Sequence, residues 1–359
     1  MMTIPTTMQG IQLIGHGGSE MLQLNEAIAV PTPSANEVLI QVAAAGVNNT
    51  DINTRIGWYS KHTDGAETSS NGISAEDASW TGSALRFPLI QGADVCGTIV
   101  AVGERVDAQR IGERVLIEPC LREVDGQLLD QPWYYGSECD GGFAQYTTVA
   151  ARHAYAVNSK LTDIELASFP CSYSTAENML TRAKVVAQDR VLISGASGGV
   201  GSAAVQLAKA RGAYVIAITS PSKSKQLLAL GADEVIPRDA DLVEALSENS
   251  VDVVIDLVAG EQWPQFLQLL KPGGRYAVSG AIGGPLVELD VRTLYLKDLT
   301  LMGCTVLGEE VFHNLVQRIE RGEIKPIVAQ TFPLAQIVAA QTLFLQKQHV
   351  GKIVLTLAS

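Results

Sequence analysis

The pattern of hydrophobic and polar positions changes near residue 190. Before that point, short apolar runs bounded by glycine, proline or charge indicate β-strands. After it, short apolar runs alternate with helical stretches, which predicts a parallel sheet covered by helices on both faces. The early strands are expected at 37–43, 97–102, 114–117 and 143–149, and the later ones at 191–194, 214–218, 251–257 and 275–279. Helices are expected at 200–211, 222–230, 241–246 and 262–270, followed by a strand at 301–306, a helix at 309–321 and a terminal strand at 351–357.

A glycine-rich turn follows the first strand of this alternating part. Residues 191–201 run from the strand through an AxGxxG core into a helix. Gly198 lets the backbone approach a pyrophosphate, and Gly201 lets the helix pack closely on the strand. Amides at the helix N-terminus then face the phosphates. The turn predicts dinucleotide binding by Ala196, Ser197, Gly198, Gly199, Val200 and Gly201. The alternative is a tight strand–helix turn that binds no ligand.

The strand that follows the turn favours NADPH as the dinucleotide. An NAD site usually ends this strand with a carboxylate that binds the ribose 2′-hydroxyl, and none is present at 217–223. Ser220 and Lys223 suit a 2′-phosphate instead, and Arg238 could add a second cation. The alternative is that Lys223 is a solvated lysine at a helix start. Further cofactor contacts are predicted at Val258, Gly280, Ala281 and Lys352.

Composition and charge narrow the class of protein. The chain has 359 residues, 47% of them hydrophobic and 18% charged, so it can bury real cores. Its net charge of −12 argues against nucleic-acid binding. No apolar run is long enough for a membrane span, and no secretory signal is visible. Five scattered cysteines without a CxxC spacing fit a reduced, cytoplasmic protein.

Several short segments together resemble the medium-chain dehydrogenase/reductase superfamily. The resemblance implies a GroES-like, β-rich catalytic domain built from both chain ends around an inserted Rossmann domain. We therefore expect a catalytic domain at 1–155 with an insertion at 60–86, a Rossmann domain at 156–306, and a return to the catalytic domain at 307–359. It also implies a homodimer formed through the cofactor domains. The segments are 46–53 (GVNNTDIN), 88–94 (PLIQGAD), 112–115 (GERV), 141–146 (GGFAQY), 196–201 (ASGGVG) and 351–354 (GKIV).

Within this superfamily the zinc-dependent branch is a poor match. Where zinc alcohol dehydrogenases carry a cysteine and a histidine, this chain has Asn48 and Ala93. Only the third ligand position matches, with Cys171, and catalytic zinc needs three protein ligands. The structural zinc lobe is also missing, since only Cys120 and Cys139 occur in its place. Cys171 is then a packed or pocket-lining thiol, or alternatively a reactive one.

The zinc-free quinone oxidoreductases and NADPH-dependent enoyl reductases resemble the chain better. Their pattern of an asparagine, an aspartate three residues on and a Gly-x-Tyr is matched by Asn48, Asp51 and 57–59. The resemblance implies that Asn48 and Asp51 line the nicotinamide end of the site. It makes Tyr59 the candidate proton donor, although Tyr59 could also stack on the substrate without giving a proton.

The expected function is reduction of a quinone or an α,β-unsaturated carbonyl, including an enoyl thioester, by NADPH without a metal. The partners expected are a small-molecule substrate and a second copy of the chain, with no nucleic acid and no membrane. Two alternatives stay open: an alcohol dehydrogenase, and a cofactor-binding protein with little turnover. The polar stretch at 60–86 could be a lid over the site or a passive, solvated insertion.

Overall fold

The computed structural model describes residues 3–61 and 76–357. The central part of the predicted insertion at 60–86, residues 62–75, lies outside the described residues. The chain divides into two compact units, the first made of 1–171, 326–348 and 352–359, the second of 172–325 and 349–351. The domain boundaries expected from the sequence remain a prediction. Among the described residues, no helix has the length and apolar character needed to span a membrane.

The first unit is β-rich. Its main sheet has the strand order β10-β6-β5-β3-β18-β17, with β9 also paired to β3, and a smaller sheet has the order β2-β1-β4. The sheet strands are β1 (Thr7–Leu13), β2 (Leu22–Ala29), β3 (Glu37–Val47), β4 (Leu89–Ile90), β5 (Asp94–Val102), β6 (Arg114–Ile117), β9 (Tyr146–Ala150), β10 (Ala154–Ala156), β17 (Val328–Pro333) and β18 (Lys352–Thr356). The hairpin is β7 (Cys120–Val124) with β8 (Gln127–Tyr134), and the helices are α1 (Asn49–Ile56), α2 (Asp163–Leu166) and α10 (Ile337–Leu345).

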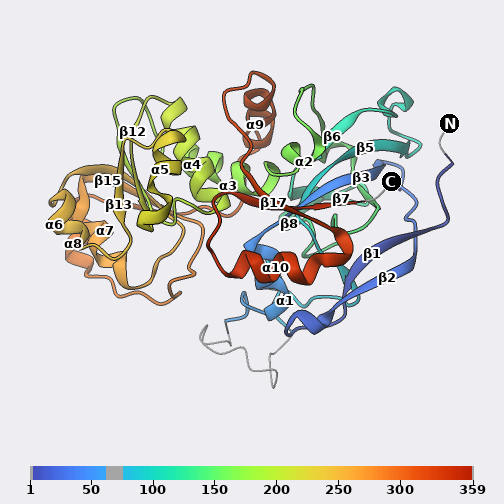
Figure 1. The fold of residues 1–359 in the computed structure, drawn as a ribbon, viewed down its shortest axis with the longest axis horizontal. Helices are drawn as coiled ribbons and strands as arrows, with labels where there is room; N and C mark the ends of the chain where they lie inside the picture. The colour runs from blue at the N-terminus through green and yellow to red at the C-terminus, as the bar shows by residue number, and fades with distance from the viewer. Residues whose placement is uncertain (1–2, 62–75, 358–359) are drawn as a thin grey trace. The chain divides into compact units, whose positions relative to one another are not determined.

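Strand β3 is the centre of this unit. Most of its side chains are buried, because β5 and β9 pair along it and α2 and α10 pack against it. The chain returns at its far end, where β18 pairs antiparallel with the last residues of β3, Val354 opposite Gly46. Figure 1 shows this return, with the red β17 and α10 beside the blue strands of the N-terminal part. The pairing places Lys352 at the end of β3, where the candidate catalytic residues begin.

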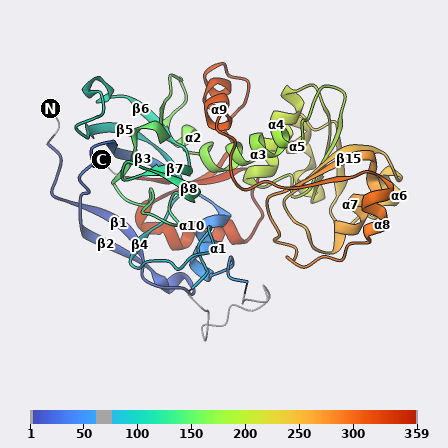
Figure 2. The same ribbon diagram turned by 180° about the vertical axis from the view of Figure 1, so that it is seen from behind.

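The second unit is the expected doubly wound sheet. Its strands are all parallel, in the order β13-β12-β11-β14-β15-β16. Right-handed crossovers from β11 outward in both directions require helices on opposite faces. In Figures 1 and 2, α4 and α5 accordingly lie apart from the group α6, α7 and α8. The strands are β11 (Arg190–Ile193), β12 (Tyr214–Thr219), β13 (Glu234–Pro237), β14 (Val251–Asp256), β15 (Leu270–Val278) and β16 (Thr300–Gly303). The helices are α3 (Pro170–Arg182), α4 (Gly199–Ala210), α5 (Ser224–Ala229), α6 (Leu242–Leu246), α7 (Trp263–Leu269), α8 (Val291–Leu296) and α9 (Val311–Glu320).

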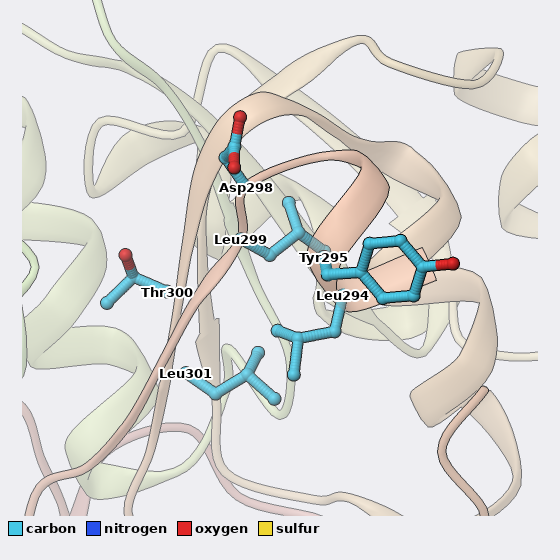
Figure 3. Close-up of a pocket in the computed structure, with 6 residues that line it drawn as sticks. All are labelled: Leu294, Tyr295, Asp298, Leu299, Thr300 and Leu301. Atoms are coloured by element: carbon cyan, nitrogen blue, oxygen red, sulfur yellow. The ribbon is translucent and has the colours of Figure 1, made fainter. Parts of the chain in front are cut away.

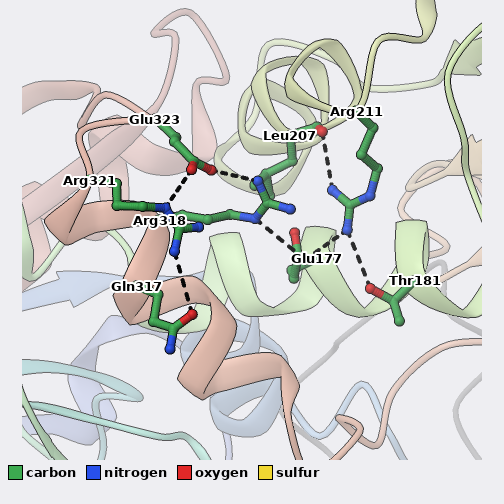
Figure 4. A network of polar contacts seen from close by, with 8 residues as sticks. All are labelled: Glu177, Thr181, Leu207, Arg211, Gln317, Arg318, Arg321 and Glu323. Carbon is green, nitrogen blue, oxygen red and sulfur yellow. Dashed lines mark hydrogen bonds and ion pairs between the residues drawn. The ribbon is translucent and has the colours of Figure 1, made fainter.

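A buried carboxylate joins three helices of the second unit. Oε1 of Glu177, on α3, lies 2.7 Å from the Arg211 guanidinium at the end of α4 and 3.7 Å from that of Arg318 on α9. Figure 4 shows Glu177 between the two arginines, with Glu323 on the far side of Arg318. Buried charges need such partners because an unpaired one is costly. The network therefore connects α9 to the dinucleotide-type sheet through α3 and α4.

Candidate functional site

The first part of the site is the junction between β3 and α1. Asn48 caps α1, and its backbone N–H donates to Oδ2 of Asp51 at 2.7 Å, so that the two residues form a capping box. Both side chains are buried. The spacing of three residues that the sequence showed is thus the spacing of a helix start. It holds Asn48 and Asp51 together at the end of a central strand.

A buried ion pair adjoins this helix start. The Lys352 ammonium lies 2.7 Å from Oδ2 of Asp94 and also donates to the Val47 carbonyl and to Oδ1 of Asn48. The Asn48 amide in turn donates to the same Asp94 oxygen at 2.8 Å. With its oxygen on Lys352 and its nitrogen on Asp94, the Asn48 side chain has a fixed orientation. The contacts of Lys352 therefore join it to the catalytic candidates, and its predicted cofactor contact stays a prediction.

Asp94 is a residue that the sequence analysis did not select. Its other oxygen, Oδ1, accepts from the Cys171 backbone N–H at 2.5 Å. One carboxylate thus binds three chain segments, those of Asn48, Cys171 and Lys352. The signal was present, because Asp94 ends the segment 88–94 on which the family resemblance rests, but a local pattern does not reveal its partners.

Burial sets the protonation of Asp51. Loss of solvation raises the pKa of Asp51 from 3.8 to about 7, against the lowering effect of the Asn48 amide and of Lys352. Gln91 donates to the Asp51 carbonyl at 2.8 Å, which is a further bond to the first turn of α1. Asp51 therefore exchanges a proton near neutral pH, which is uncommon for a carboxyl group.

Tyr59 lies just beyond α1. Its hydroxyl donates to Oγ1 of Thr50 at 3.1 Å, at the start of the same helix. Burial raises the pKa of Tyr59 to about 12. The phenol is therefore protonated at neutral pH and can serve as a hydrogen-bond or proton donor.

A second tyrosine lies in the same region of the first unit. The Tyr134 hydroxyl is 2.9 Å from Sγ of Cys171, and both side chains are buried with Ala93. Burial raises the pKa of Cys171 to about 12, and the Asp94 charge acts in the same direction. Cys171 is therefore a packed thiol that is hydrogen-bonded to a phenol, which is the first of the two roles expected from the sequence.

The described end of the insertion packs onto this pair. The Trp80 ring stacks on that of Tyr134, with centroids 5.0 Å apart and an interplanar angle of 29°. The Trp80 backbone donates to Ser137, and the next amide donates to Glu138, which also accepts from the Tyr134 amide. This part of 60–86 is thus bound to the site through Trp80, while 62–75 lies outside the described residues.

The catalytic zinc of the zinc alcohol dehydrogenases does not fit these residues. Within 3–61 and 76–357, no group of three or more histidine, cysteine, aspartate or glutamate side chains could hold a metal ion. At the expected ligand positions, Asn48 is held by Asp94 and Lys352, and Cys171 contacts Tyr134. The Ala93 side chain has no atom that can bind a metal.

The glycine-rich turn has the geometry that a dinucleotide requires. Gly198 caps α4, and a Cβ there would meet only the Gly195 carbonyl, at 3.5 Å, so the surface above it is open. A Cβ on Gly201 would come within 2.3 Å of the same carbonyl, so the helix needs glycine to pack against the turn that follows β11. The first amides of a helix lack intrahelical acceptors and suit a pyrophosphate. Ala196, Ser197, Gly199 and Val200 complete this turn as predicted, and their contacts with a cofactor stay a prediction.

The structure gathers the predicted phosphate ligands at the end of β12. The Lys223 ammonium donates to Oγ of Ser197 at 3.2 Å, which links it to the glycine-rich turn. Burial lowers the pKa of Lys223, and the nearby Arg238 charge lowers it further. Arg238 is held at this place because its backbone N–H donates to the Thr219 carbonyl at 3.0 Å. Two cations and Ser220 thus surround one strand end, an arrangement that an anion would stabilise.

Val258, Gly280 and Ala281 lie in the loops after β14 and β15. The Val258 carbonyl accepts from the Gly283 amide at 2.7 Å, so the two loops are joined. A Cβ on Gly280 would come within 2.8 Å of the Leu257 carbonyl, which explains glycine there. These residues are at the carboxyl ends of the strands, the edge where open parallel sheets bind ligands.

Comparisons with known proteins agree with this geometry. The family model described as "Alcohol dehydrogenase GroES-like domain" matches residues 34–159, and that described as "Zinc-binding dehydrogenase" matches 199–321. The quinone oxidoreductase of Lama guanicoe is 30% identical, over 98% of this chain and 98% of its own. The chain belongs to the medium-chain dehydrogenase/reductase superfamily. The expected fold, a GroES-like domain with a Rossmann domain, is confirmed.

Two further relatives carry other names. The acryloyl-coenzyme A reductase of Metallosphaera sedula is 28% identical over 97% of this chain and 100% of its own. A solved structure from Sinorhizobium meliloti 1021, provisionally named an alcohol dehydrogenase, is 44% identical, covers 99% of this chain and 98% of its own, and has a TM-score of 0.89. The chain is thus an oxidoreductase of the nicotinamide-dinucleotide-dependent type, and its relatives act on small molecules.

Proposed function

We propose that this protein reduces a quinone or an α,β-unsaturated carbonyl with NADPH and without zinc. The proposal rests on the hydrogen bonds of the Asn48 side chain. Its amide nitrogen donates to Asp94, and its amide oxygen accepts from Lys352. A zinc-dependent relative would carry a metal-binding thiol at this position. The resemblance to a quinone oxidoreductase and an acryloyl-coenzyme A reductase supports the same class of reaction.

The chemistry follows from the conjugated acceptor. Bound NADPH would supply a hydride from C4 of its nicotinamide. When the acceptor takes the hydride, negative charge moves onto its oxygen, where fixed donors stabilise it. Tyr59 is protonated at neutral pH and can donate the proton that completes reduction of an enone. A quinone needs no proton on carbon, so its reduction depends less on Tyr59.

The preference for NADPH rests on the end of β12. A 2′-phosphate would relieve the repulsion between Lys223 and Arg238, since it carries the opposite charge. NADH, which lacks this phosphate, would leave the repulsion between the two cations in place. Binding energy for the extra phosphate therefore comes from groups already held in place by Ser197 and Thr219.

A substrate panel tests the proposal. Quinones, enones, an enoyl thioester and primary alcohols are assayed with each of the two cofactors, and the metal content of the same preparation is measured. Turnover of a quinone or enone with NADPH, by protein that contains no stoichiometric zinc, is the expected result. Turnover of alcohols alone, by protein with one zinc per chain, would establish an alcohol dehydrogenase instead, as the name of the Sinorhizobium structure suggests.

We also propose that two copies associate through the second unit. Strand β16 is at the edge of its sheet, and an open edge with apolar surroundings is suited to pairing. Figure 3 shows the pocket beside it, which Leu294, Tyr295 and Leu301 help to line. Size-exclusion chromatography with light scattering should give a molar mass of twice the chain mass. In Leu296→Glu the molar mass should fall to that of a single chain. The exposed apolar residues of this region are Ile282, Leu286, Val287, Val291, Tyr295 and Leu296.

A further inference from the structure

A fully buried carboxylate lies under the loop that follows β14. Asp256 is the last residue of that strand and has no exposed surface. Its Oδ1 accepts from the Ser194 hydroxyl at 2.5 Å, and its Oδ2 accepts from the Tyr276 hydroxyl at 2.5 Å. Ser194 directly follows β11 and Tyr276 lies in β15, the two strands that pair with β14. One side chain thus connects β14 to the residue after β11 and to the last part of β15.

The same carboxylate holds the backbone of the loop. The Val258 amide donates to Oδ1 at 2.9 Å, and the Ala259 amide lies 3.1 and 3.2 Å from the two oxygens. The Ser194 hydroxyl, besides donating to Asp256, accepts from the Leu257 amide at 2.8 Å. The Val258 and Ala259 amides therefore bond to Asp256 directly, and the Leu257 amide bonds to the hydroxyl that Asp256 holds. Hydrogen bonds from this many donors offset the unfavourable free energy of burying a carboxylate.

The backbone that Asp256 holds is in an uncommon conformation. Ala259 has φ 55° and ψ −140°, outside the regions that residues with a Cβ adopt readily. Such a conformation persists only where the surroundings impose it. Here they do so through the Asp256 bonds on one side and the bond from Gly283 to the Val258 carbonyl on the other. Without the carboxylate, the loop would relax.

The position of the loop in the sheet indicates which part of the cofactor it would meet. The strand order reverses between β11 and β14, and dinucleotides bind across such a reversal. The phosphate-binding candidates Ser220 and Lys223 follow β12, on one side of β11. The loop held by Asp256 follows β14, on the other side, so it faces the nicotinamide half if the adenine half lies at β12.

We propose that Asp256 is a positioning residue for the nicotinamide half of the cofactor. It acts through the loop 257–260, whose shape it imposes, and it makes no contact with the cofactor itself. Ser194 and Tyr276 hold the carboxylate in place. The proposal rests on the proposed function insofar as it assumes a bound nicotinamide dinucleotide.

The test separates the two halves of the cofactor. Dissociation constants are measured by calorimetry for NADPH and for adenosine 2′,5′-bisphosphate, which lacks the nicotinamide half. In Asp256→Asn, we expect NADPH to bind about tenfold more weakly, while the bisphosphate binds as it does to the unaltered protein. Tyr276→Phe and Ser194→Ala each remove one donor to Asp256. Each should also weaken the binding of NADPH and not that of the bisphosphate, by less than Asp256→Asn does. Asp252→Asn, which changes the other aspartate of β14, should alter neither constant.

Two results would overturn the proposal. One is an equal loss of affinity for NADPH and the bisphosphate, which a merely structural role predicts. The other is unchanged binding of both ligands by all three variants. If Asp256→Asn does not fold, as judged by its thermal melting curve, Tyr276→Phe and Ser194→Ala carry the test. Failure of the proposed function has a different signature: the unaltered protein then prefers NADH, and the comparison is repeated with NADH and 5′-AMP.

Discussion

The ammonium of Lys352 lies 2.7 Å from Oδ2 of Asp94, and both side chains are almost completely buried. Lys352 begins the last strand, β18, and Asp94 begins β5. The C-terminal return of the chain thus supplies the positive charge that a buried carboxylate of the N-terminal part needs. Because Asn48 binds both members, the orientation of a candidate catalytic amide depends on the last strand of the fold.

Lys352→Met should destabilise the protein by about 3–5 kcal/mol, because it leaves the buried Asp94 carboxylate without its cationic partner. The free energy of unfolding is measured in urea. The double variant Lys352→Met/Asp94→Asn is the matched comparison, since it removes both charges. It should recover part of the loss; a double variant that loses the sum of two independent effects would contradict the pairing.

Asp51→Asn should change how stability depends on pH. The pKa of Asp51 rises from 3.8 to about 7 on folding, so the folded state binds more protons in this window. The free energy of unfolding of the unaltered protein therefore falls as the pH rises from 3.8 to about 7. Its contribution to the slope is at most about 1.4 kcal/mol per pH unit. In Asp51→Asn that contribution is absent, and identical slopes for the two proteins would disprove the assignment.

Tyr59→Phe should slow reduction of an enone by about 100-fold, because the proton donor is removed while the ring remains. Quinone reduction by the same variant is the internal control and should change little. Both rates are measured at saturating NADPH. Enone reduction at the unaltered rate would leave Tyr59 with a packing role only.

Lys223→Ala should weaken the binding of NADPH by about tenfold or more. A loss of this size is expected when one charge-assisted hydrogen bond is removed. The KM for NADH should stay the same, because NADH has no 2′-phosphate. Lys225→Ala removes an exposed lysine two residues away and serves as the matched control. An equal loss for both cofactors would reject the 2′-phosphate assignment.

Trp80→Ala should make Cys171 react faster with iodoacetamide. In the unaltered protein the thiol is buried with Trp80 and Tyr134, and its pKa of about 12 leaves little thiolate at neutral pH. Labelling is followed by mass spectrometry of peptides. Cys304, in the second unit, provides the reference rate and should not change. If Cys171 labels at the same rate in both proteins, Trp80 does not shield it.

Local patterns predicted much of the second unit from the sequence. The run at 191–194 became β11, and the helix expected at 200–211 is α4 (Gly199–Ala210). Both were readable because buried parallel strands have continuous apolar runs, and because the turn between them needs glycine at fixed spacing. The spacing of Asn48 and Asp51 was equally local, since it belongs to one turn of helix.

Other elements carried no such signal. The sequence predicted neither the hairpin β7–β8 nor α10, and it extended the strand at 301–306 beyond Gly303, where β16 ends. Helix α10 is apolar around most of its circumference, so its residues show no amphipathic stripe. Its place is decided by contacts with β3, β17 and β18.

By itself, then, the sequence determined the glycine turn, the alternation of strands and helices, and the residue types of the candidate site, because each depends on neighbours a few positions apart. Only the tertiary structure decided the partners of buried charges. Lys352 meets Asp94, and Asp256 meets Ser194 and Tyr276, through the pairing of strands that are not local in sequence. A charged side chain has no periodic pattern that names its partner; strand pairing and the cost of burying an unpaired charge select it.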